Sequence, residues 1–278
     1  MPQAILTDRA QIHVSGTDAQ HFLHNLVTTD IEGLPNAVWM ASALLSAQGK
    51  IMFGFLVARE EDGFVLELAL QDAAEFYKRL KFYRLRAKVD LFEPIPVSMA
   101  VSWNSGATDP AALRDGRFSG LEIWRSARSA FAHGDADAWA SLRIEHGIAE
   151  PHADYAYNDV FPHDVNLDQI NGVSFKKGCY VGQEVVSRMQ HRGTARRRVM
   201  VASGLGALTS GAEVVADGKT AGSIGSVSGM TGMALVRLDR IRDAIDRGAP
   251  VTAGDVAITL QFPSGVSYGW PIVTDADA

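Results

Sequence analysis

The sequence predicts an α+β fold: a body of mixed and antiparallel sheets with helices over residues 1–198, then a small C-terminal β-barrel over residues 199–278. Strand-like and helix-like patterns alternate through the first 95 residues without a long parallel-sheet series, which favours α+β. After Arg198 the chain changes to short strand-like runs separated by Gly, Ser and Asp, a pattern typical of a small barrel. Glu93-Pro94-Ile95-Pro96 indicates a junction, which makes residues 96–146 a candidate sub-module.

The elements of the body follow from hydrophobic spacing and helix-start signals. Thr17 is expected to cap a helix and Gln20 to complete a capping box, with Leu23 on the buried face. A second helix opens at Asp72 and buries Phe76. The expected strands are residues 11–14, 38–45, 51–58, 64–70, 86–91, 97–103 and 121–124.

Later elements are signalled by glycines and short apolar runs. A third helix is expected over residues 135–146, and a fourth runs from near Gly182 to a stop at Gly193. Asp217-Gly218 predicts a two-residue hairpin turn. The expected barrel strands are residues 199–202, 213–216, 222–228, 233–238 and 257–262.

The composition is that of an ordinary globular protein, with 47% hydrophobic and 21% charged residues among 278. No stretch approaches 18 uninterrupted apolar residues, so no membrane span is expected. The N-terminus lacks a basic region followed by an apolar run, as a signal peptide would have. Cys179 is the only cysteine, which excludes an intramolecular disulfide framework and fits a reducing compartment. The expected location is the cytoplasm.

Charge is spread unevenly along the chain. The net charge is −6, but residues 176–198 hold seven Lys or Arg against one acid, Glu184, a local charge of +6. This pattern favours a localised anion site over a general nucleic-acid binder, so direct binding of nucleic acid is not expected. The alternative is that Arg196, Arg197 and Arg198 form a solvated strand edge.

Residues 177–184 read Lys-Gly-Cys-Tyr-Val-Gly-Gln-Glu. A thiol at a helix start beside ammonium groups favours the thiolate, and the glycines at 178 and 182 allow positive φ and close backbone approach. The pattern predicts a reactive thiol at Cys179; the alternative is a buried cysteine that acts as a small hydrophobe. No tightly bound metal is predicted, because the eight His show no His-Glu-x-x-His pair and one cysteine cannot build a thiolate cage.

Two carboxylates are candidates for binding a guanidine-like edge such as that of a pterin. Glu145 lies near the end of the third expected helix, and Asp164 lies in a loop before the thiol motif. The alternative for both is a surface or capping carboxylate. Tyr83 is one of several aromatic residues that either stack on a flat heterocycle or belong to the core.

The octapeptide at residues 177–184 resembles the hallmark motif of the YgfZ-type folate-binding proteins, a family that includes mitochondrial iron–sulfur assembly factors. The likeness covers essentially the whole chain, although the C-terminal barrel resembles the family in its pattern of short strands more than in a sequence motif. Other similar stretches are His21-Phe22-Leu23-His24-Asn25-Leu26 with Thr29-Asp30, Gln48-Gly49-Lys50, Tyr83-Arg84-Leu85-Arg86, and Pro162 through Leu167.

The resemblance implies a body related to the glycine-cleavage T-protein, an aminomethyltransferase, followed by its β-barrel domain and with a site for tetrahydrofolate. It implies an accessory role in assembly or repair of 4Fe–4S clusters, which supports tRNA modification through the cluster enzymes. The implied partners are folate and iron–sulfur apoenzymes or assembly scaffold proteins.

Residue roles also carry over from the resemblance. Cys179 would be the reactive group, Lys177 would stabilise the thiolate and bind an anion, and Tyr180 would pack or donate a hydrogen bond. Gln183 and Glu184 would satisfy backbone donors at the helix start. Asp164 stands where relatives often have Glu. The implied folate-binding residues are Glu145, Asp164, Tyr83, Arg86, Gly178, Gly182, Gln183 and Glu184.

Two other functions stay open at this point. A folate-dependent aminomethyltransferase needs an acid near the reacting folate nitrogen, but Phe53 and Gly54 stand where T-proteins generally carry an Asp pair. A tRNA-binding module would use the arginines at residues 188–198, and its binding would weaken steeply with salt.

Overall fold

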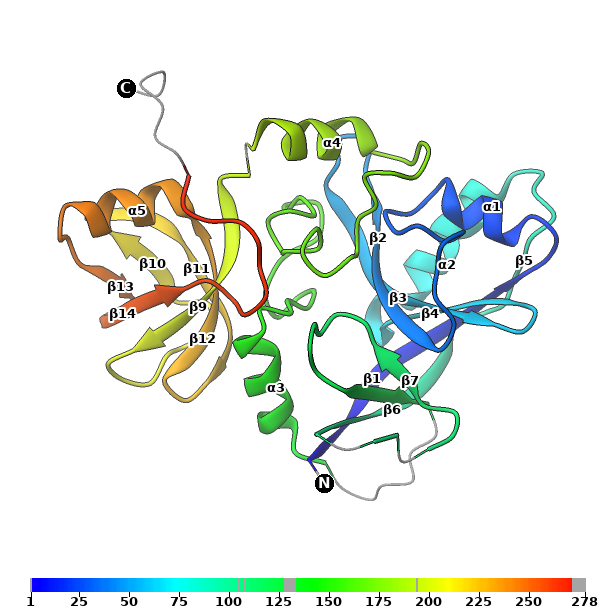
Figure 1. Ribbon diagram of the computed structural model, residues 1–278, viewed down its shortest axis with the longest axis horizontal. Coiled ribbons are helices and arrows are strands. Elements are labelled where there is room, and N and C mark those ends of the chain that lie inside the picture. Colours follow the sequence, from blue (N-terminus) through cyan, green and yellow to red (C-terminus); the bar gives the residue numbers. More distant parts are fainter. Residues whose placement is uncertain (1, 105, 108, 128–133, 194, 272–278) are drawn as a thin grey trace. The chain divides into compact units, whose positions relative to one another are not determined.

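The computed structural model describes residues 2–104, 106–107, 109–127, 134–193 and 195–271 (Figure 1). The chain divides into two compact units, each assembled from three segments. None of the helices in the described ranges combines the length and the apolar content that a membrane crossing requires. Unit 1 comprises Met1–Trp139, Tyr157–Pro162 and Ile170–Arg188, and unit 2 comprises Ala140–Ala156, His163–Gln169 and Met189–Ala278.

Unit 1 is built on one eight-stranded sheet. Its strands are β1 (Gln3–Ser15), β2 (Val38–Leu45), β3 (Ile51–Glu60), β4 (Gly63–Ala69), β5 (Asp90–Leu91), β6 (Ile95–Trp103), β7 (Leu113–Asp115) and β8 (Ile123–Ser126). The strand order is β4-β3-β2-β7-β8-β6-β1-β5, and β1 pairs with β4 as well. Because the long first strand pairs with both β4 and β6, the sheet curves back on itself.

The expected junction at residues 93–96 does not separate a module. β6 begins at Ile95, which lies opposite Gln11 of β1, and β7 and β8 continue the same sheet. Strands β6, β7 and β8 are therefore part of the sheet of unit 1, and they do not start a separate sub-module at 96–146. Within that range, residues 105, 108 and 128–133 lie outside the described part.

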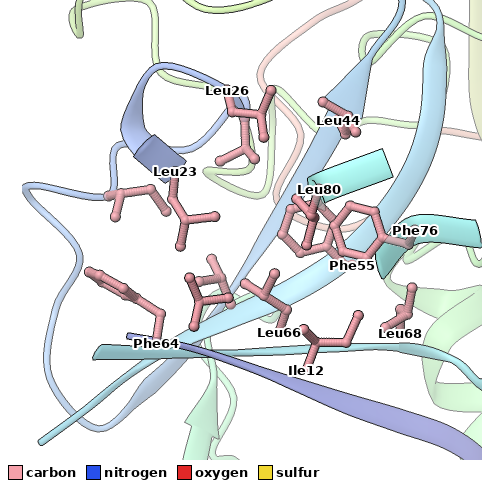
Figure 2. Close-up of a cluster of buried hydrophobic side chains, with 14 of the residues drawn as sticks. Ile12, Leu23, Leu26, Leu44, Phe55, Phe64, Leu66, Leu68, Phe76 and Leu80 are labelled. Atoms are coloured by element: carbon pink, nitrogen blue, oxygen red, sulfur yellow. The ribbon is translucent and has the colours of Figure 1, made fainter. Parts of the chain in front are cut away.

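Helices α1 (Ala19–His24) and α2 (Leu70–Arg84) cover a hydrophobic core on this sheet (Figure 2). Ile12 and Leu66 from the strands meet Leu23 of α1 and Phe76 of α2, and all four side chains are fully buried. Each such side chain contributes about 1.5–3 kcal/mol when it leaves water. This core fixes the ends of both helices, which line the site described below.

The start of α1 differs from the expected capping box. Its N-cap residue is Asp18, and no side chain caps the helix. The Oδ2 atom of Asp18 instead accepts a hydrogen bond of 2.7 Å from the backbone N–H of Lys88. Residues 85–89 form a turn and loop there, so only Asp90–Leu91 of the strand expected at 86–91 is formed.

A group of buried charges crosses the same sheet. Arg125 of β8 donates hydrogen bonds to Glu67 of β4 and to Asp115 of β7, and all three side chains are fully buried. Arg9 donates to Glu67 at 2.9 Å, and Arg117 donates to Asp115 at 2.7 Å. Burial opposes ionisation of the two carboxyls, but the arginines outweigh it and hold both pKa values below their ordinary range.

Unit 2 contains a closed six-stranded barrel with strand order β10-β11-β12-β9-β14-β13. Its strands are β9 (Arg197–Gly204), β10 (Glu213–Ala216), β11 (Lys219–Ser228), β12 (Thr231–Arg237), β13 (Val251–Ala253) and β14 (Val256–Gln261). The predicted boundary between residues 198 and 199 falls inside β9. Asp217 and Gly218, with φ of 49° and 70°, form the hairpin turn expected between β10 and β11.

The predicted α+β body with a C-terminal β-barrel is confirmed. Helices α3 (Ala136–Glu145) and α4 (Gln183–Arg192) lie within or next to their expected ranges. α4 stops before Gly193, which has a φ of 60°, as expected for a helix end. Strand β13 and helix α5 (Leu238–Asp246) were not expected from the sequence.

Candidate functional site

The motif at residues 177–184 forms a loop that leads into α4, and Lys177 fastens this loop to unit 1. Its Nζ atom donates three hydrogen bonds to backbone carbonyls: to His24 at 2.5 Å, to Val27 at 2.5 Å and to Thr29 at 2.8 Å. An ammonium group has three N–H donors, so all of them are used. The loop is thereby joined to the segment that follows α1.

These contacts correct the role expected for Lys177. Burial lowers the pKa of its ammonium to about 8, against the opposing attraction of Asp30 and Glu32. With three carbonyl acceptors already in place, the ammonium has no N–H left for a bound anion. Lys177 therefore acts on the position of the loop, and its expected contact with an anionic ligand is not supported.

Tyr180 packs beneath the same ammonium. The Nζ atom of Lys177 lies 4.9 Å from the centre of the Tyr180 ring, a cation–π arrangement. The tyrosine is 7% exposed, and burial raises its pKa to about 12. Its hydroxyl has no hydrogen-bond partner among the described residues. Of the two roles expected for Tyr180, the structure shows the packing role; the buried hydroxyl donates to no described residue.

The two glycines of the motif differ. Gly182 has a φ of 79°, and a Cβ atom there would lie 2.5 Å from the carbonyl oxygen of Ser46 and 3.1 Å from the Cα of Gly49. The expected close approach is therefore confirmed at Gly182. Gly178 has no positive φ, and a Cβ atom there would meet nothing within 4 Å. The expected backbone requirement is wrong for Gly178.

Cys179 is exposed to solvent. The alternative in which it is a buried small hydrophobe is therefore excluded. The next two polar residues also differ from expectation: Glu184 forms an ion pair of 2.6 Å with Arg188 and does not cap the helix. The side chain of Gln183 makes no hydrogen bond within the described part of the chain, while its backbone N–H donates to the carbonyl of Tyr180 at 3.2 Å.

A pocket of about 400 Å³ in unit 1 connects the motif with two other predicted residues. Val181 lines it from the motif, and Tyr83 and Arg86 line it from the segment that follows α2. Phe22 and Leu26 add an aromatic and an aliphatic wall. The structure thus brings together three stretches of the resemblance that are far apart in sequence.

Sequence reasoning had not assigned several of the residues that line this pocket to a binding site. They are Asp18, His21, Phe22, Asn25, Leu26, Arg84 and Val181. The signal for four of them was present in the stretch from His21 to Leu26, which carries part of the resemblance. The sequence predicted a helix there and no binding role, and a helix pattern does not say which residues face a cavity.

The two carboxylates expected to bind a pterin lie in unit 2 and are in different surroundings. Glu145 is the last residue of α3 and is exposed. Asp164 is 3% exposed, and its Oδ2 atom accepts hydrogen bonds from Arg197 at 2.9 Å and 3.3 Å. Because this oxygen is already held by a guanidinium group, Asp164 is better explained as an internal partner of the barrel than as a ligand acceptor.

Internal ion pairs also occupy two arginines of the basic stripe, Arg197 and Arg198. Arg198 is 6% exposed, donates to Asp168 at 2.6 Å and 3.1 Å, and lies 4.2 Å from the centre of the Tyr268 ring. Arg197 is paired with Asp164 as described above. The alternative of a solvated strand edge is wrong for these two arginines. A tRNA-binding surface would have to be built from what is left of the stripe, which weakens that alternative.

The position expected to hold the acids of an aminomethyltransferase is aromatic. The ring of Phe53 packs against two other rings: its centre lies 5.1 Å from the centre of the Phe76 ring and 5.7 Å from that of the Tyr157 ring. The backbone N–H of Gly54 donates to the Tyr157 hydroxyl at 3.3 Å, and that hydroxyl donates to Asp72 at 3.1 Å. Phe53 and Gly54 offer no group that could take or orient a proton.

The chain resembles known proteins in both sequence and fold. Residues 196–268 match the CAF17 C-terminal beta-barrel domain. The chain is 31% identical over 228 residues to the tRNA-modifying protein YgfZ of Edwardsiella ictaluri, covering 69% of this chain and 68% of that protein. It is 30% identical over 282 residues to the mitochondrial iron–sulfur cluster assembly factor IBA57 of Mus musculus, covering 85% and 78%.

Longer relatives match as well. The chain is 30% identical over 227 residues to a mitochondrial IBA57 homolog of Neurospora crassa, and the match spans about half of that protein, 52% of its length. Among solved structures, the glycine cleavage system aminomethyltransferase T from Bartonella henselae superposes with a TM-score of 0.69. That match covers 95% of this chain and 85% of the other at 15% sequence identity, so it shows a shared fold alone.

Proposed function

Because the chain belongs to the family of YgfZ and IBA57 proteins, we propose that it binds tetrahydrofolate and assists the assembly or repair of 4Fe–4S clusters. Its partners would be iron–sulfur apoenzymes or assembly scaffold proteins, and the cluster enzymes that it serves would include tRNA-modifying ones. The names of the relatives support the iron–sulfur part of this proposal. The folate part rests on the geometry of unit 1. The cytoplasmic location stays a prediction, since several of the matched relatives are named as mitochondrial.

One observation carries the proposal: the motif loop presents Cys179 to solvent while it is fixed on both sides. Lys177 anchors the residues before the thiol through three hydrogen bonds, and Gly182 anchors the residues after it through its contact with Gly49. Such fixing of an exposed nucleophile by neighbours with no role in the chemistry is typical of functional loops.

The pocket of about 400 Å³ fits a flat heterocycle of moderate size, because ligand pockets usually range from about 300 to 1,000 Å³. The ring of Tyr83 and the guanidinium of Arg86 are groups on which a planar ligand can stack, and Phe22 supplies an apolar wall. Val181 belongs both to this wall and to the motif loop. A ligand in the pocket would therefore touch the same loop that carries the thiol.

The chemistry of the thiol follows from there being one cysteine in the chain. A 4Fe–4S cluster is held by four thiolates in most proteins, so Cys179 can supply at most one of them. The remaining ligands would come from the partner. Cys179 would act as a transient ligand while the partner receives the cluster, or its thiolate would take the outer sulfur of a partner's persulfide and release the partner's thiolate.

Aminomethyl transfer is not part of the proposal. The superposition on an aminomethyltransferase concerns the fold, and Phe53 and Gly54 supply no carboxyl group at the two positions where T-proteins generally carry an Asp pair. If the purified chain transfers a one-carbon unit from an aminomethylated lipoyl carrier to tetrahydrofolate, this exclusion is contradicted.

Folate binding is tested by calorimetric titration of the full chain with tetrahydrofolate. The Arg86→Gln variant should bind more weakly, because it removes a charged group from the pocket wall. Arg79→Gln is the matched control, since Arg79 is exposed on α2, which ends two residues before Arg86, and does not line the pocket. Absence of binding by the unmodified chain would overturn the folate part.

The iron–sulfur part is tested in cells that lack their own relative of this protein. The unmodified chain should restore the activity of a 4Fe–4S enzyme, measured per amount of that enzyme, and Cys179→Ala should not. Thermal unfolding of the purified variant should match the unmodified chain, since an exposed side chain contributes little to stability. Full restoration by the Ala variant would remove Cys179 from the mechanism.

A further inference from the structure

A cavity of about 350 Å³ opens in unit 1 beside the turn between β3 and β4, and the proposed function does not use it. Three segments that are distant in sequence line it: His13, Val14 and Ser15 of β1, Glu60, Asp62 and Gly63 around the turn, and Phe92 and Ile95 near the start of β6. None of these residues lines the pocket of about 400 Å³ described above, so the two cavities are separate features of unit 1.

Backbone contacts fix the turn and the segment after β5 against β1. Gly63 pairs with Ser15, and a Cβ atom on Gly63 would lie 2.1 Å from the carbonyl oxygen of Val14. The backbone N–H of Phe92 donates to the carbonyl of His13 at 3.1 Å. The side chains around the cavity are therefore carried by a backbone that is already in place, and little ordering is needed when a ligand binds.

The charge of the cavity is negative. Two carboxylates line it, and no lysine or arginine does. The Nδ1 atom of His13 donates to Oε2 of Glu60 at 2.7 Å, which leaves Oε1 of this carboxylate as a further acceptor. The side chain of Asp62 is exposed and forms no hydrogen bond or ion pair with other described residues. Such a lining favours a cationic ligand.

Apolar surface is exposed at the same place. Phe92 and Ile95 are 52% and 51% exposed, and both line the cavity. Large apolar side chains that stay in solvent beside charged groups mark surfaces that another molecule covers. The ligand should therefore carry an apolar part as well as a positive charge.

From this combination we infer that the cavity receives an arginine side chain from an exposed segment of a partner protein. A guanidinium group donates to carboxylates through a planar set of N–H groups, and its flat face stacks on aromatic rings. Glu60 and Asp62 would accept those hydrogen bonds, and the ring of Phe92 would take the flat face. An apolar residue next to the arginine in the segment would cover Ile95. The inference goes beyond the proposed function, because it requires neither folate nor a cluster.

The test uses the peptide acetyl-Gly-Arg-Leu-Gly-amide as the probe, titrated into the full chain and followed by amide NMR spectra. Shifts should be largest at residues 13–15, 60–63 and 92–95. The same peptide with citrulline, which is neutral and of the same shape, should bind about tenfold more weakly, because it lacks the charge that both carboxylates would attract. Spermidine brings charge without a flat cation and should also bind more weakly than the arginine peptide.

Variants test the two parts of the lining separately. Asp62→Asn should weaken binding of the arginine peptide about threefold, as expected for one solvent-accessible ion pair. Asp8→Asn is the matched control, because it makes the same change on an exposed residue of β1 that does not line the cavity. Phe92→Ala should also weaken binding, whereas Phe82→Ala, at an exposed ring outside the cavity, should leave it unchanged.

Four results would overturn the inference. They are no binding of the arginine peptide by the unmodified chain, equal binding of the citrulline peptide, equal losses in a variant and its matched control, and binding of spermidine as tight as that of the arginine peptide. The last result would assign the cavity to free amines. Each of these results would leave the folate and iron–sulfur tests of the proposed function unaffected, so the two can fail separately.

Discussion

Gly49 and Gly182 bring two distant turns into backbone contact. A Cβ atom on Gly182 would lie 3.1 Å from the Cα of Gly49, and a Cβ atom on Gly49 would lie 3.0 Å from the Cβ of Val185. Both glycines have a φ of 79°. The contact places the turn before β3 directly against the start of α4, so the geometry of the thiol loop depends on a residue 133 positions earlier.

Replacing Gly182 by Ala should therefore destabilise the protein strongly. The left-handed backbone costs an L-residue about 1–2 kcal/mol, and overpacking against the carbonyl of Ser46 costs about 1–3 kcal/mol more. The expected loss in the free energy of unfolding is about 2–5 kcal/mol, measured by urea denaturation. Gly178→Ala is the control and should change it by less than about 0.5 kcal/mol, because a Cβ atom there meets open space. Similar losses in the two variants would contradict the close approach.

Lys177→Met should also destabilise the protein. The variant removes three hydrogen bonds from a charged donor, each worth about 1.5–3 kcal/mol. It also relieves the cost of burying the ammonium, about 3 kcal/mol from the lowered pKa. The first effect is larger, so a net loss of about 1.5–6 kcal/mol is expected in urea denaturation. Lys176→Met, at the exposed neighbouring position, should be nearly neutral. If Lys177→Met is as stable as the unmodified chain, the three carbonyl groups accept hydrogen bonds from water in its place.

Local patterns were sufficient for much of the fold. The strand expected at residues 38–45 is observed with the same bounds, and the hairpin at Asp217-Gly218 follows from two residues that tolerate positive φ. Helix α5 was missed although Leu238 and Ile241 form a buried stripe on it. It follows β12 without a break, and Leu238 had been counted as the end of that strand.

Long-range contacts explain what the sequence could not predict. A capping box was expected at Thr17 and Gln20, yet the N-cap residue is Asp18, whose side chain accepts a hydrogen bond from the N–H of Lys88, 70 positions away. Arg197 and Arg198 read as an exposed basic run, because their partners Asp164 and Asp168 lie about thirty residues earlier. Charge counted along the sequence does not show which cations are already paired in space.

The motif was recognised from sequence, but the role of Lys177 was not. A lysine two residues before a cysteine suggests an electrostatic effect on the thiol. The structure instead uses its side chain on the carbonyls of residues 24, 27 and 29. No sequence pattern shows in which direction a lysine side chain leaves a loop, so this assignment required the structure.

The lowered pKa of Lys177 predicts a pH dependence of stability. The group titrates near 8 in the folded chain, against 10.5 for a lysine without these surroundings. Between these values the unfolded chain binds more protons than the folded chain, so the free energy of unfolding rises with pH in this window. Below pH 8 both states are protonated and the gain is absent. Urea denaturation between about pH 7.5 and 10.5 should show a rise of up to roughly 3 kcal/mol that is missing in Lys177→Met. Parallel curves for the two proteins would contradict the shift.

Replacing Arg125 should lower the free energy of unfolding more than replacing most other charged residues of unit 1. It is fully buried between Glu67 and Asp115, so Arg125→Met leaves both carboxylates with one fewer cation in a site without water access. Breaking a buried ion pair from one side costs about 3–5 kcal/mol. The midpoint of urea denaturation should fall accordingly, with an unchanged slope. Arg114→Met, an exposed change on the neighbouring strand β7, should have little effect.

A second substitution separates lost packing from unpaired charge at this position. Adding Glu67→Gln to Arg125→Met removes one of the carboxylates that the first change left with fewer cations. Stability should then recover in part, because a neutral amide is far less costly to bury than an uncompensated carboxylate. If the free energy of unfolding of the double variant is instead lower than that of Arg125→Met, the loss caused by replacing Arg125 comes from packing and not from unpaired charge.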